Sequence, residues 1–231
     1  MAGINDELRQ IILTGNSRNI LEVGCGTGYW LSSFKTEKVN LFGVDLSTGM
    51  LRQISNIDLK LHLICADANS LPLIDEQFDL VFCVNAIHQF RDKKGFIKSA
   101  AQLLKPDGIL AVVGLDPGHK DHKWYIYDFF NGIYDKDLKR FPSFDDIQNW
   151  MKDCGLKKIR VNIADKIRND RTGKDVFNDS FLLKNQSSQL ASLTDQEYSA
   201  GIEKIKEAVE KDPELLFPVR MNFVLIKASK M

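Results

Sequence analysis

The sequence lacks the features of a membrane-spanning, secreted or polyanion-binding protein. No apolar run approaches the ~20 residues that a membrane helix needs, and residues 1–10 lack the basic and apolar regions of a secretion signal. Lys+Arg and Asp+Glu both number 31, so no net charge draws the chain toward nucleic acid or an anionic membrane. We therefore expect a cytoplasmic protein with no membrane partner, and nucleic acid is not the favoured partner.

Cysteine is sparse and scattered. The four residues are Cys25, Cys65, Cys83 and Cys154. They form no CxxC pair and no Cys/His cluster at zinc-finger spacing. His119 and His122 lie three residues apart without an identifiable third ligand, so we interpret them as solvent-facing polar residues. The sequence thus favours buried free thiols and predicts no metal site.

The composition is that of a folded globular protein. Hydrophobic residues make up 44% of the 231 residues and charged residues 27%, and only 6 residues are proline, which argues against a disordered or collagen-like chain. The length lies between those of one and two average domains. We expect one compact domain that carries an elaboration.

The first two thirds of the chain alternate between short apolar runs and amphipathic stretches. The apolar runs predict strands over residues 19–23, 39–44, 59–65, 78–84 and 109–114. The amphipathic stretches predict helices over residues 5–13, 29–34 and 93–104, with a further helix that Ser47 could cap. This alternation implies a parallel sheet covered by helices on both faces.

The pattern changes after the fifth predicted strand. Residues 116–140 are crowded with aromatic side chains and predict a loop that leads into a helix. A helix capped by Ser143 and a strand over residues 157–163 follow. Residues 166–218 are mostly helical in pattern, and Thr194-x-x-Glu197 within them has the spacing of a capping box ahead of a long helix. Residues 219–227 alternate as a strand does. The long connection between the last two strands exceeds a turn and predicts a helical cap over the sheet.

A glycine-rich loop follows the first predicted strand, in the sequence Glu22-Val23-Gly24-Cys25-Gly26-Thr27-Gly28. Glycines between a strand and a helix let a ligand approach the backbone closely. Asp45 ends the second strand, where a carboxylate can accept hydrogen bonds from both hydroxyls of a ribose. A dinucleotide fingerprint has a small residue at the position of Tyr29, so the loop does not match that fingerprint. Glu22, an acid before the loop, suits a ligand that carries an ammonium group. These features indicate an adenosine-containing cofactor at the carboxyl edge of the sheet.

The loop E-V-G-C-G-T-G resembles motif I of the class I S-adenosylmethionine methyltransferases. Four further segments resemble that family in the same order, at residues 42–47, 66–72, 78–88 and 103–110. In the last of them Asp107 stands where the family has the first glycine of L-L-K-P-G-G. The resemblance covers residues 19–114, and its motifs are specific jointly and weak singly.

The resemblance implies S-adenosylmethionine as the cofactor and S-adenosylhomocysteine as the product. It implies a doubly wound, Rossmann-like α/β fold: a mostly parallel seven-stranded sheet with the last strand antiparallel, and the helical cap inserted between the last two strands. We expect a single methyltransferase domain over residues 1–231. Its parts are a cofactor-binding half (1–115), a substrate-side loop with helices and the sixth strand (116–165), the cap (166–218) and the last strand (219–231).

The resemblance also implies which residues hold the cofactor: Glu22, Gly24, Cys25, Gly26, Gly28, Asp45, Leu46, Asp67, Ala68 and Asn85. Asp45 would bind the ribose, although such an acid can also cap a helix. Asp67 would accept from the adenine amino group, or could stabilise a turn. Glu22 could instead only organise the loop. Asp79 begins a strand, and we assign it to structure.

His88 is the candidate general base, because it follows the fourth strand and imidazole takes up a proton near neutral pH. Family members that act on small molecules often carry a His-His pair here, where this chain has His88-Gln89. A structural or substrate-orienting role for His88 is the alternative. Trp30, Trp124 and Tyr125 join His88 as candidate substrate-contacting residues of an apolar pocket.

These features predict methyl transfer to a small-molecule acceptor, with an oxygen nucleophile favoured over nitrogen or carbon. Three alternatives stay open: a nicotinamide-dependent oxidoreductase, a non-catalytic partner subunit that binds S-adenosylmethionine, and an RNA methyltransferase. The last would use the basic residues within 152–174. The sequence leaves the acceptor and the oligomeric state open.

Overall fold

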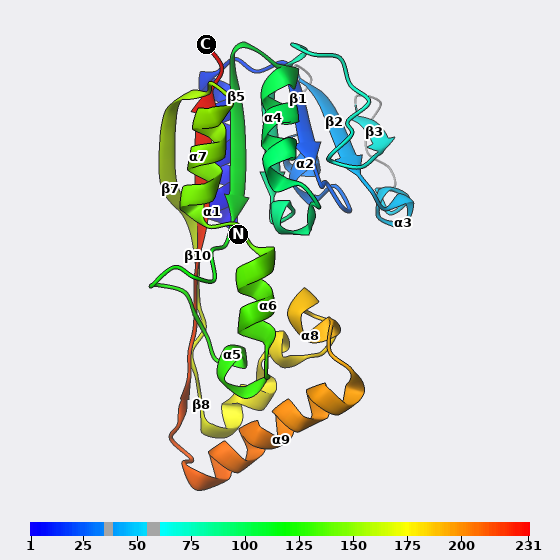
Figure 1. Ribbon diagram of the computed structural model, residues 1–231. Coiled ribbons are helices and arrows are strands. Elements are labelled where there is room, and N and C mark those ends of the chain that lie inside the picture. Colours follow the sequence, from blue (N-terminus) through cyan, green and yellow to red (C-terminus); the bar gives the residue numbers. More distant parts are fainter. Residues whose placement is uncertain (35–38, 55–60) are drawn as a thin grey trace. The chain divides into compact units, whose positions relative to one another are not determined.

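The computed structural model describes residues 1–34, 39–54 and 61–231 (Figure 1). Within these ranges, no helix is both long and apolar enough to cross a membrane. The chain divides into two compact units. The sheet unit comprises Met1–Leu115, Pro142–Asp165 and Phe223–Met231, and the helical unit comprises Asp116–Phe141 and Lys166–Asn222. The role of residues 166–218 as a cap over the sheet stays a prediction.

The main sheet contains eight strands in the order β3-β2-β1-β4-β5-β10-β6, with β7 paired to β10. The strands are β1 Asn19–Val23, β2 Asn40–Asp45, β3 Leu61–Cys65, β4 Phe78–Val84, β5 Leu104–Gly114, β6 Lys123–Trp124, β7 Lys157–Arg168 and β10 Val219–Ser229. Strands β1 to β5 pair in parallel, and β10 is antiparallel to β5. The predicted mostly parallel sheet is confirmed, and the short β6 is an addition to it. Residues 59 and 60 of the third predicted strand lie outside the described residues.

The strand order reverses between β1 and β4. On one side β1 pairs with β2, so that Val23 lies opposite Val44, and on the other side it pairs with β4, so that Glu22 lies opposite Phe82. In doubly wound sheets, ligands bind outside the carboxyl ends of the strands at such a reversal. The fold therefore brings the loops after β1, β2 and β4 to the edge where a ligand is expected.

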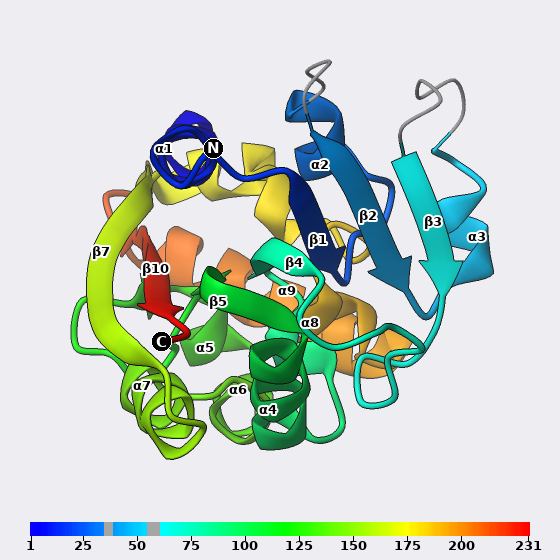
Figure 2. The same ribbon diagram turned by 90° about the horizontal axis from the view of Figure 1, so that it is seen from above.

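Helices cover both faces of the sheet within the sheet unit (Figure 2). Helices α4 (Lys93–Leu103) and α7 (Phe144–Asp153) lie on one face, and α1 (Ala2–Thr14) and α2 (Tyr29–Ser33) lie on the other. A core cluster joins the sheet to α4 and α7 and includes the fully buried Phe96. Each large apolar side chain buried in this way stabilises the fold by about 1.5–3 kcal/mol.

Side-chain caps begin several helices where the sequence predicts them. Ser47 accepts a backbone N–H at the start of α3 (Thr48–Leu51). Ser143 forms a capping box before α7, and the Thr194-x-x-Glu197 spacing forms another before α9 (Asp195–Lys211). Caps of this kind contribute about 1 kcal/mol each.

Strand β5 begins earlier than the predicted start at Ile109. Leu104 already pairs with Phe78, and the register then shifts before Leu80 pairs with Ile109. The intervening segment contains Asp107, whose φ of +63° is left-handed. Glycine adopts this conformation readily, and Asp tolerates it better than most other residues. The backbone thus explains how Asp107 can stand where the resembled family has glycine.

The helical unit combines several short helices with the long helix α9 and a short strand pair. It contains α5 (Ile126–Phe129), α6 (Ile133–Arg140), α8 (Ser188–Ala191), α9, the 3-10 helices η2 (Gly173–Asn178) and η3 (Ser180–Leu182), and the paired strands β8 (Arg171–Thr172) and β9 (Leu216–Phe217). A Cβ on Gly201 would collide with the ring of Phe130, so glycine lets α9 approach the end of α5. The sequence predicts one helix where α5 and α6 form, and it does not predict the β8–β9 pair.

The four cysteines are free thiols that differ in exposure. Cys25 and Cys83 are buried and Cys154 is half-buried, but Cys65 is exposed. The expectation of a buried thiol is wrong for Cys65 because it lies in β3, the last strand at its end of the sheet order, where most residues are exposed.

Asp79, at the start of β4, joins three segments of the chain. Its Oδ2 accepts from the backbone N–H groups of Arg18 and Asn19 at 2.9 and 2.7 Å, and its Oδ1 accepts from Lys105 Nζ at 2.9 Å. Partial burial alone would raise the pKa of this carboxyl. The hydrogen bonds from Asn19, Lys105 and Arg18 outweigh burial and hold the pKa of Asp79 below its usual value. These contacts support the structural role expected of Asp79.

Replacing Asp79 with Asn should lower the free energy of unfolding by about 1–2 kcal/mol at neutral pH, because a charged acceptor is lost. A carboxyl with a lowered pKa contributes stability above its unfolded pKa of about 3.9 and loses it as the pH falls through the folded pKa. Urea titrations should therefore show the deficit of Asp79→Asn shrinking below about pH 4. Asp75→Asn, at an exposed acid, is the control. A deficit that stays constant into acid would contradict this role.

Candidate functional site

A cavity of about 370 Å³ lies at the carboxyl ends of β1, β2 and β4 in the sheet unit. Of the residues expected to bind a cofactor, those that line it are Gly24, Gly26, Asp45, Leu46, Asp67, Ala68 and Asn85. These residues come from four separate segments of the chain. The structure thus brings most of the predicted cofactor-binding residues into one hollow.

The glycine loop is fastened to the end of β2. The backbone N–H groups of Gly24 and Cys25 both donate to the carbonyl of Val44, at 2.8 and 3.0 Å. Gly24, Gly26 and Gly28 all have left-handed φ angles, of +78°, +53° and +73°. Residues with a Cβ rarely adopt this conformation. The turn therefore depends on glycine for its backbone path.

Two of the glycines differ in what surrounds them. A Cβ on Gly24 would collide with the Cβ of Ala86 and would lie 3.4 Å from the ring of Phe90. A Cβ on Gly26 would meet no atom of the described residues within 4 Å. The loop after β1 thus packs against the loop after β4 at Gly24, while Gly26 faces open space that a ligand can enter.

Asp45 holds two loops at the cavity. Its Oδ2 accepts from the N–H of Gly26 and its Oδ1 accepts from the N–H of Ser47, both at 2.8 Å. Each carboxylate oxygen can accept a further hydrogen bond. The side chain is therefore oriented by the backbone and still has acceptor capacity at the cavity.

Asp67 is anchored in a turn. Its Oδ1 accepts from the N–H of Asn69 at 2.9 Å, and the Asn69 side chain in turn donates to the carbonyl of Asp92 at 2.5 Å. Asp92 caps α4 by accepting from Gly95. The turn role that the sequence left open for Asp67 is thus present, and the residue also lines the cavity.

Asn85 follows β4 in a left-handed conformation, with φ +51°. Its backbone N–H donates to Val113 at 2.9 Å, while its side-chain Oδ1 is buried and finds no hydrogen-bond partner among the described residues. A buried acceptor without a partner is costly. Because Asn85 lines the cavity, a donor group of a ligand would satisfy it.

Glu22, Cys25 and Gly28 are not among the residues that line the cavity. Glu22 is 1% exposed, and its Oε2 has no hydrogen-bond partner in the described part of the chain. Burial raises the pKa of Glu22 well above its usual range, with a further contribution from Asp45 and an opposing one from the backbone of Leu31. Burial, with Glu22 and Asp45 nearby, also raises the pKa of the Cys25 thiol to about 12. A contact between Glu22 and a ligand stays a prediction.

His88 lies in the 3-10 helix η1 (Ile87–Gln89) and is buried, 9% exposed. It does not line the cavity, whereas the adjacent Gln89, Phe90 and Arg91 do. Gln89 and Arg91 are site residues that the motifs did not predict, although they follow the family-like segment 78–88 closely in the sequence. The role of His88 as a base stays a prediction.

The other candidate substrate residues are distributed over both units. Trp30 lies in α2, is buried and packs edge-on against Tyr29. Trp124 lines a different cavity, within the helical unit. Tyr125 is 1% exposed, and its hydroxyl donates to Asp179 at 3.0 Å. That contact gives Tyr125 a structural role, and its contact with a substrate stays a prediction.

Replacing Gly24 with Ala should destabilise the protein more than the same change at Gly155, which has φ +80° and open space around it. In both variants the alanine must adopt a left-handed φ, which lowers the free energy of unfolding by about 1–2 kcal/mol. The collision with Ala86 should add about 1–3 kcal/mol in Gly24→Ala only. Urea unfolding of the two variants measures the difference. Equal losses would show that the packing of the glycine loop against Ala86 is not required.

Comparisons with known proteins agree with this geometry. Residues 21–112 match the protein family described as "Methyltransferase domain". The arginine-hydroxylase NDUFAF5 of Danio rerio mitochondria is 35% identical over 156 residues, which is 62% of this chain but only 46% of that protein. The ubiquinone biosynthesis O-methyltransferase of Coxiella burnetii is 24% identical over 165 residues, 66% of this chain and 68% of that protein.

Among solved structures, a protein of Anabaena variabilis described as a methyltransferase from an antibiotic biosynthesis pathway superposes with a TM-score of 0.70. It is 17% identical, and the superposition covers 96% of both chains, so the likeness is one of fold. The matched segment, residues 21–112, contains the glycine loop, Asp45, Asp67 and Asn85. Within this segment the chain is therefore similar to the methyltransferase family, in agreement with the resemblance of its motifs to the class I S-adenosylmethionine-dependent enzymes.

Proposed function

We propose that the protein transfers a methyl group from S-adenosylmethionine to a small-molecule acceptor, with an oxygen nucleophile favoured over nitrogen or carbon. The observation that carries the proposal is the cavity at the sheet reversal, where Gly26, Asp45, Asp67 and Asn85 converge. The relative from Coxiella burnetii is named as an O-methyltransferase, which supports the choice of oxygen.

The residues of the cavity fit the parts of this cofactor. Asp45 has acceptor capacity left for the ribose hydroxyls, and Asp67 can accept from the adenine amino group. The space beside Gly26 admits a ligand against the backbone, and the unpartnered Oδ1 of Asn85 suits a hydroxyl or ammonium donor. The acids favour a ligand rich in donors over one that carries only phosphates.

The cofactor supplies an activated methyl group on a sulfonium, so the protein can act mainly by alignment and exclusion of water. The loops after β1 and β4 hold the site through their contact at Gly24, and Asp45 orients the loops after β1 and β2. A hydroxyl acceptor must also lose a proton, which is the role proposed for His88. Its position between Ala86 and Gln89, which both line the cavity, supports that role.

Asp45→Asn should weaken the binding of S-adenosylhomocysteine by roughly 10- to 100-fold, because the variant loses charged acceptors for ribose hydroxyls. Isothermal titration calorimetry on the full chain measures the change. Asp75→Asn, at an exposed acid away from the cavity, should bind as the wild type does. An absence of binding to the wild-type protein, or stabilisation by NADH instead, would contradict the proposal.

The transferred group itself can be followed with S-adenosylmethionine labelled in its methyl group and a metabolite extract, with mass spectrometry of the products. We expect a small molecule that carries the label on oxygen. Because the relative from Danio rerio is named as a hydroxylase, a product that gains oxygen without the label is the informative contrary result.

Once the acceptor is known, His88→Gln should lower the rate constant by about 10²- to 10⁴-fold while leaving the affinity for S-adenosylhomocysteine unchanged. His62→Gln, at an exposed histidine of β3, is the matched control. An unchanged rate constant in His88→Gln would leave the proposed methyl transfer intact and refute the base.

A further inference from the structure

A second cavity, of about 480 Å³, lies entirely within the helical unit. Its walls include the aromatic rings of Trp124, Tyr127 and Tyr134, and His122 also lines it. Tyr127 packs against both other rings, with centroids 5.7 Å from Trp124 and 5.1 Å from Tyr134. Flat aromatic walls of this kind suit a planar ring as the occupant.

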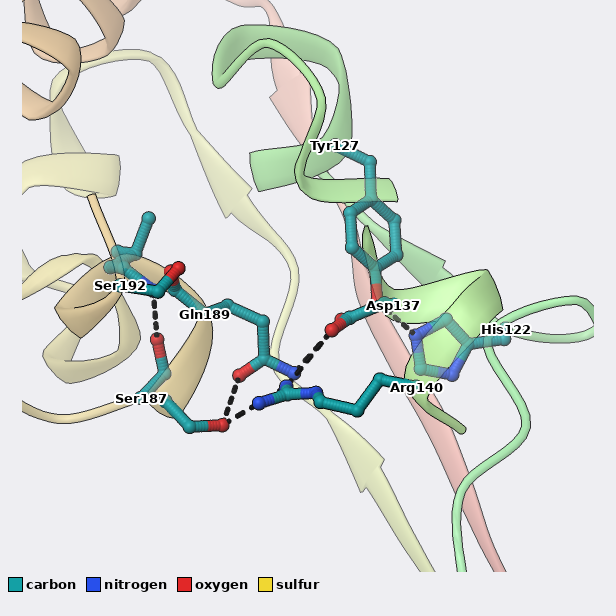
Figure 3. A network of polar contacts seen from close by, with 9 residues as sticks. His122, Tyr127, Asp137, Arg140, Ser187, Gln189 and Ser192 are labelled. Atoms are coloured by element: carbon teal, nitrogen blue, oxygen red, sulfur yellow. Dashed lines mark hydrogen bonds and ion pairs between the residues drawn. The ribbon is translucent and has the colours of Figure 1, made fainter. Parts of the chain in front are cut away.

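Behind this cavity lies a buried polar network centred on Asp137 (Figure 3). Asp137 is 2% exposed, and it accepts from the hydroxyl of Tyr127, from Nε2 of Gln189 and from the guanidinium of Arg140, each at 2.9 Å. These donors come from α5, α8 and α6. A buried carboxylate with three such donors is held in a fixed position. The proton of the Tyr127 hydroxyl therefore points toward Asp137.

The direction of the Tyr127 hydroxyl proton determines which ring nitrogen of His122 carries the hydrogen. The Tyr127 hydroxyl donates to Asp137, so its oxygen can serve only as an acceptor for His122 Nε2, which lies 3.5 Å away. Burial and Asp137 raise the pKa of Tyr127, so the phenol keeps its proton. The imidazole then carries its hydrogen on Nε2 and leaves Nδ1 as an acceptor.

Burial also keeps the imidazole neutral. It lowers the pKa of His122 below the usual value, against the opposing charges of Asp137 and Asp116 and with a contribution from His119. A neutral Nδ1 accepts a hydrogen bond from a ligand but offers nothing to a carboxylate oxygen. The wall also contains Trp124, whose buried indole N–H has no hydrogen-bond partner among the described residues.

We propose that this cavity binds a planar aromatic ligand that carries a hydroxyl group, and that His122 Nδ1 accepts the hydrogen bond of that hydroxyl. A hydroxyl can both donate and accept, so it can donate to His122 Nδ1 and accept from the indole N–H of Trp124; His119 and Asp128 also line the cavity. Lys120 and Lys123 at the cavity are exposed, so water screens their charges and they do not select a carboxylate. The site lies in the helical unit alone, and the inference does not depend on methyl transfer.

The test uses the full chain without S-adenosylmethionine and three probes: phenol, benzene and benzoate. Titrations at neutral pH followed by NMR should show phenol binding about 3- to 10-fold more tightly than benzene, the difference that one hydrogen bond makes. His122→Phe should remove that preference. Tyr127→Phe should reduce it, whereas Tyr134→Phe, which loses a hydroxyl outside the network, should retain it.

The protonation of the ring can be observed directly in the wild-type protein. Two-dimensional ¹H–¹⁵N correlation of the histidine side chains should show His122 with its hydrogen on Nε2, and Tyr127→Phe should weaken that preference. This measurement stands even if His122→Phe fails to fold. A hydrogen on Nδ1, equal affinity for phenol and benzene, or tighter binding of benzoate would each overturn the proposal.

Discussion

The close approach of the glycine loop to the loop after β4 is the contact on which the cavity at the sheet reversal depends. At Gly24 there is no room for a Cβ, because Ala86 and the ring of Phe90 occupy that space. The same residue donates its N–H to Val44 at the end of β2. One residue without a side chain therefore joins the ends of three neighbouring strands, and the hollow between them follows from that packing.

Acidic groups set the electrostatic character of this hollow. Asp45 and Asp67 present carboxylates to it, and Glu22 lies buried nearby with its pKa raised by burial. Backbone N–H groups of Gly26, Ser47 and Asn69 hold Asp45 and Asp67, both half-buried, in place. Preoriented acceptors lose little freedom when they bind, so they favour a ligand with several hydroxyl or amino donors. The helical unit uses a similar device at Asp137, whose surrounding donors fix the direction of a tyrosine proton.

Much of the sheet and of the cofactor site is predictable from the sequence because both depend on local signals. The bounds of β1 and β4, the caps at Ser143 and Thr194 and the cavity position of Asp45 all follow from short patterns of apolar, capping and glycine residues. Contacts between distant segments carry no such pattern. The network that joins Asp137 to Gln189, the burial of Glu22 beneath its loop and the β8–β9 pair could not be read from spacing.

The exposure of Cys65 gives the protein a natural attachment point for a reporter group. Its Sγ lies 3.5 Å from the carbonyl of Leu46, a residue that lines the cavity at the sheet reversal. Cys25 and Cys83 are buried, and the pKa of each thiol is raised to about 12, so both stay protonated and unreactive at neutral pH. Cys154 is half-buried, and burial together with Asp153 raises the pKa of its thiol. An environment-sensitive dye that reacts with thiolates would therefore attach mainly at the edge strand, where its emission senses the occupancy of the adjacent hollow.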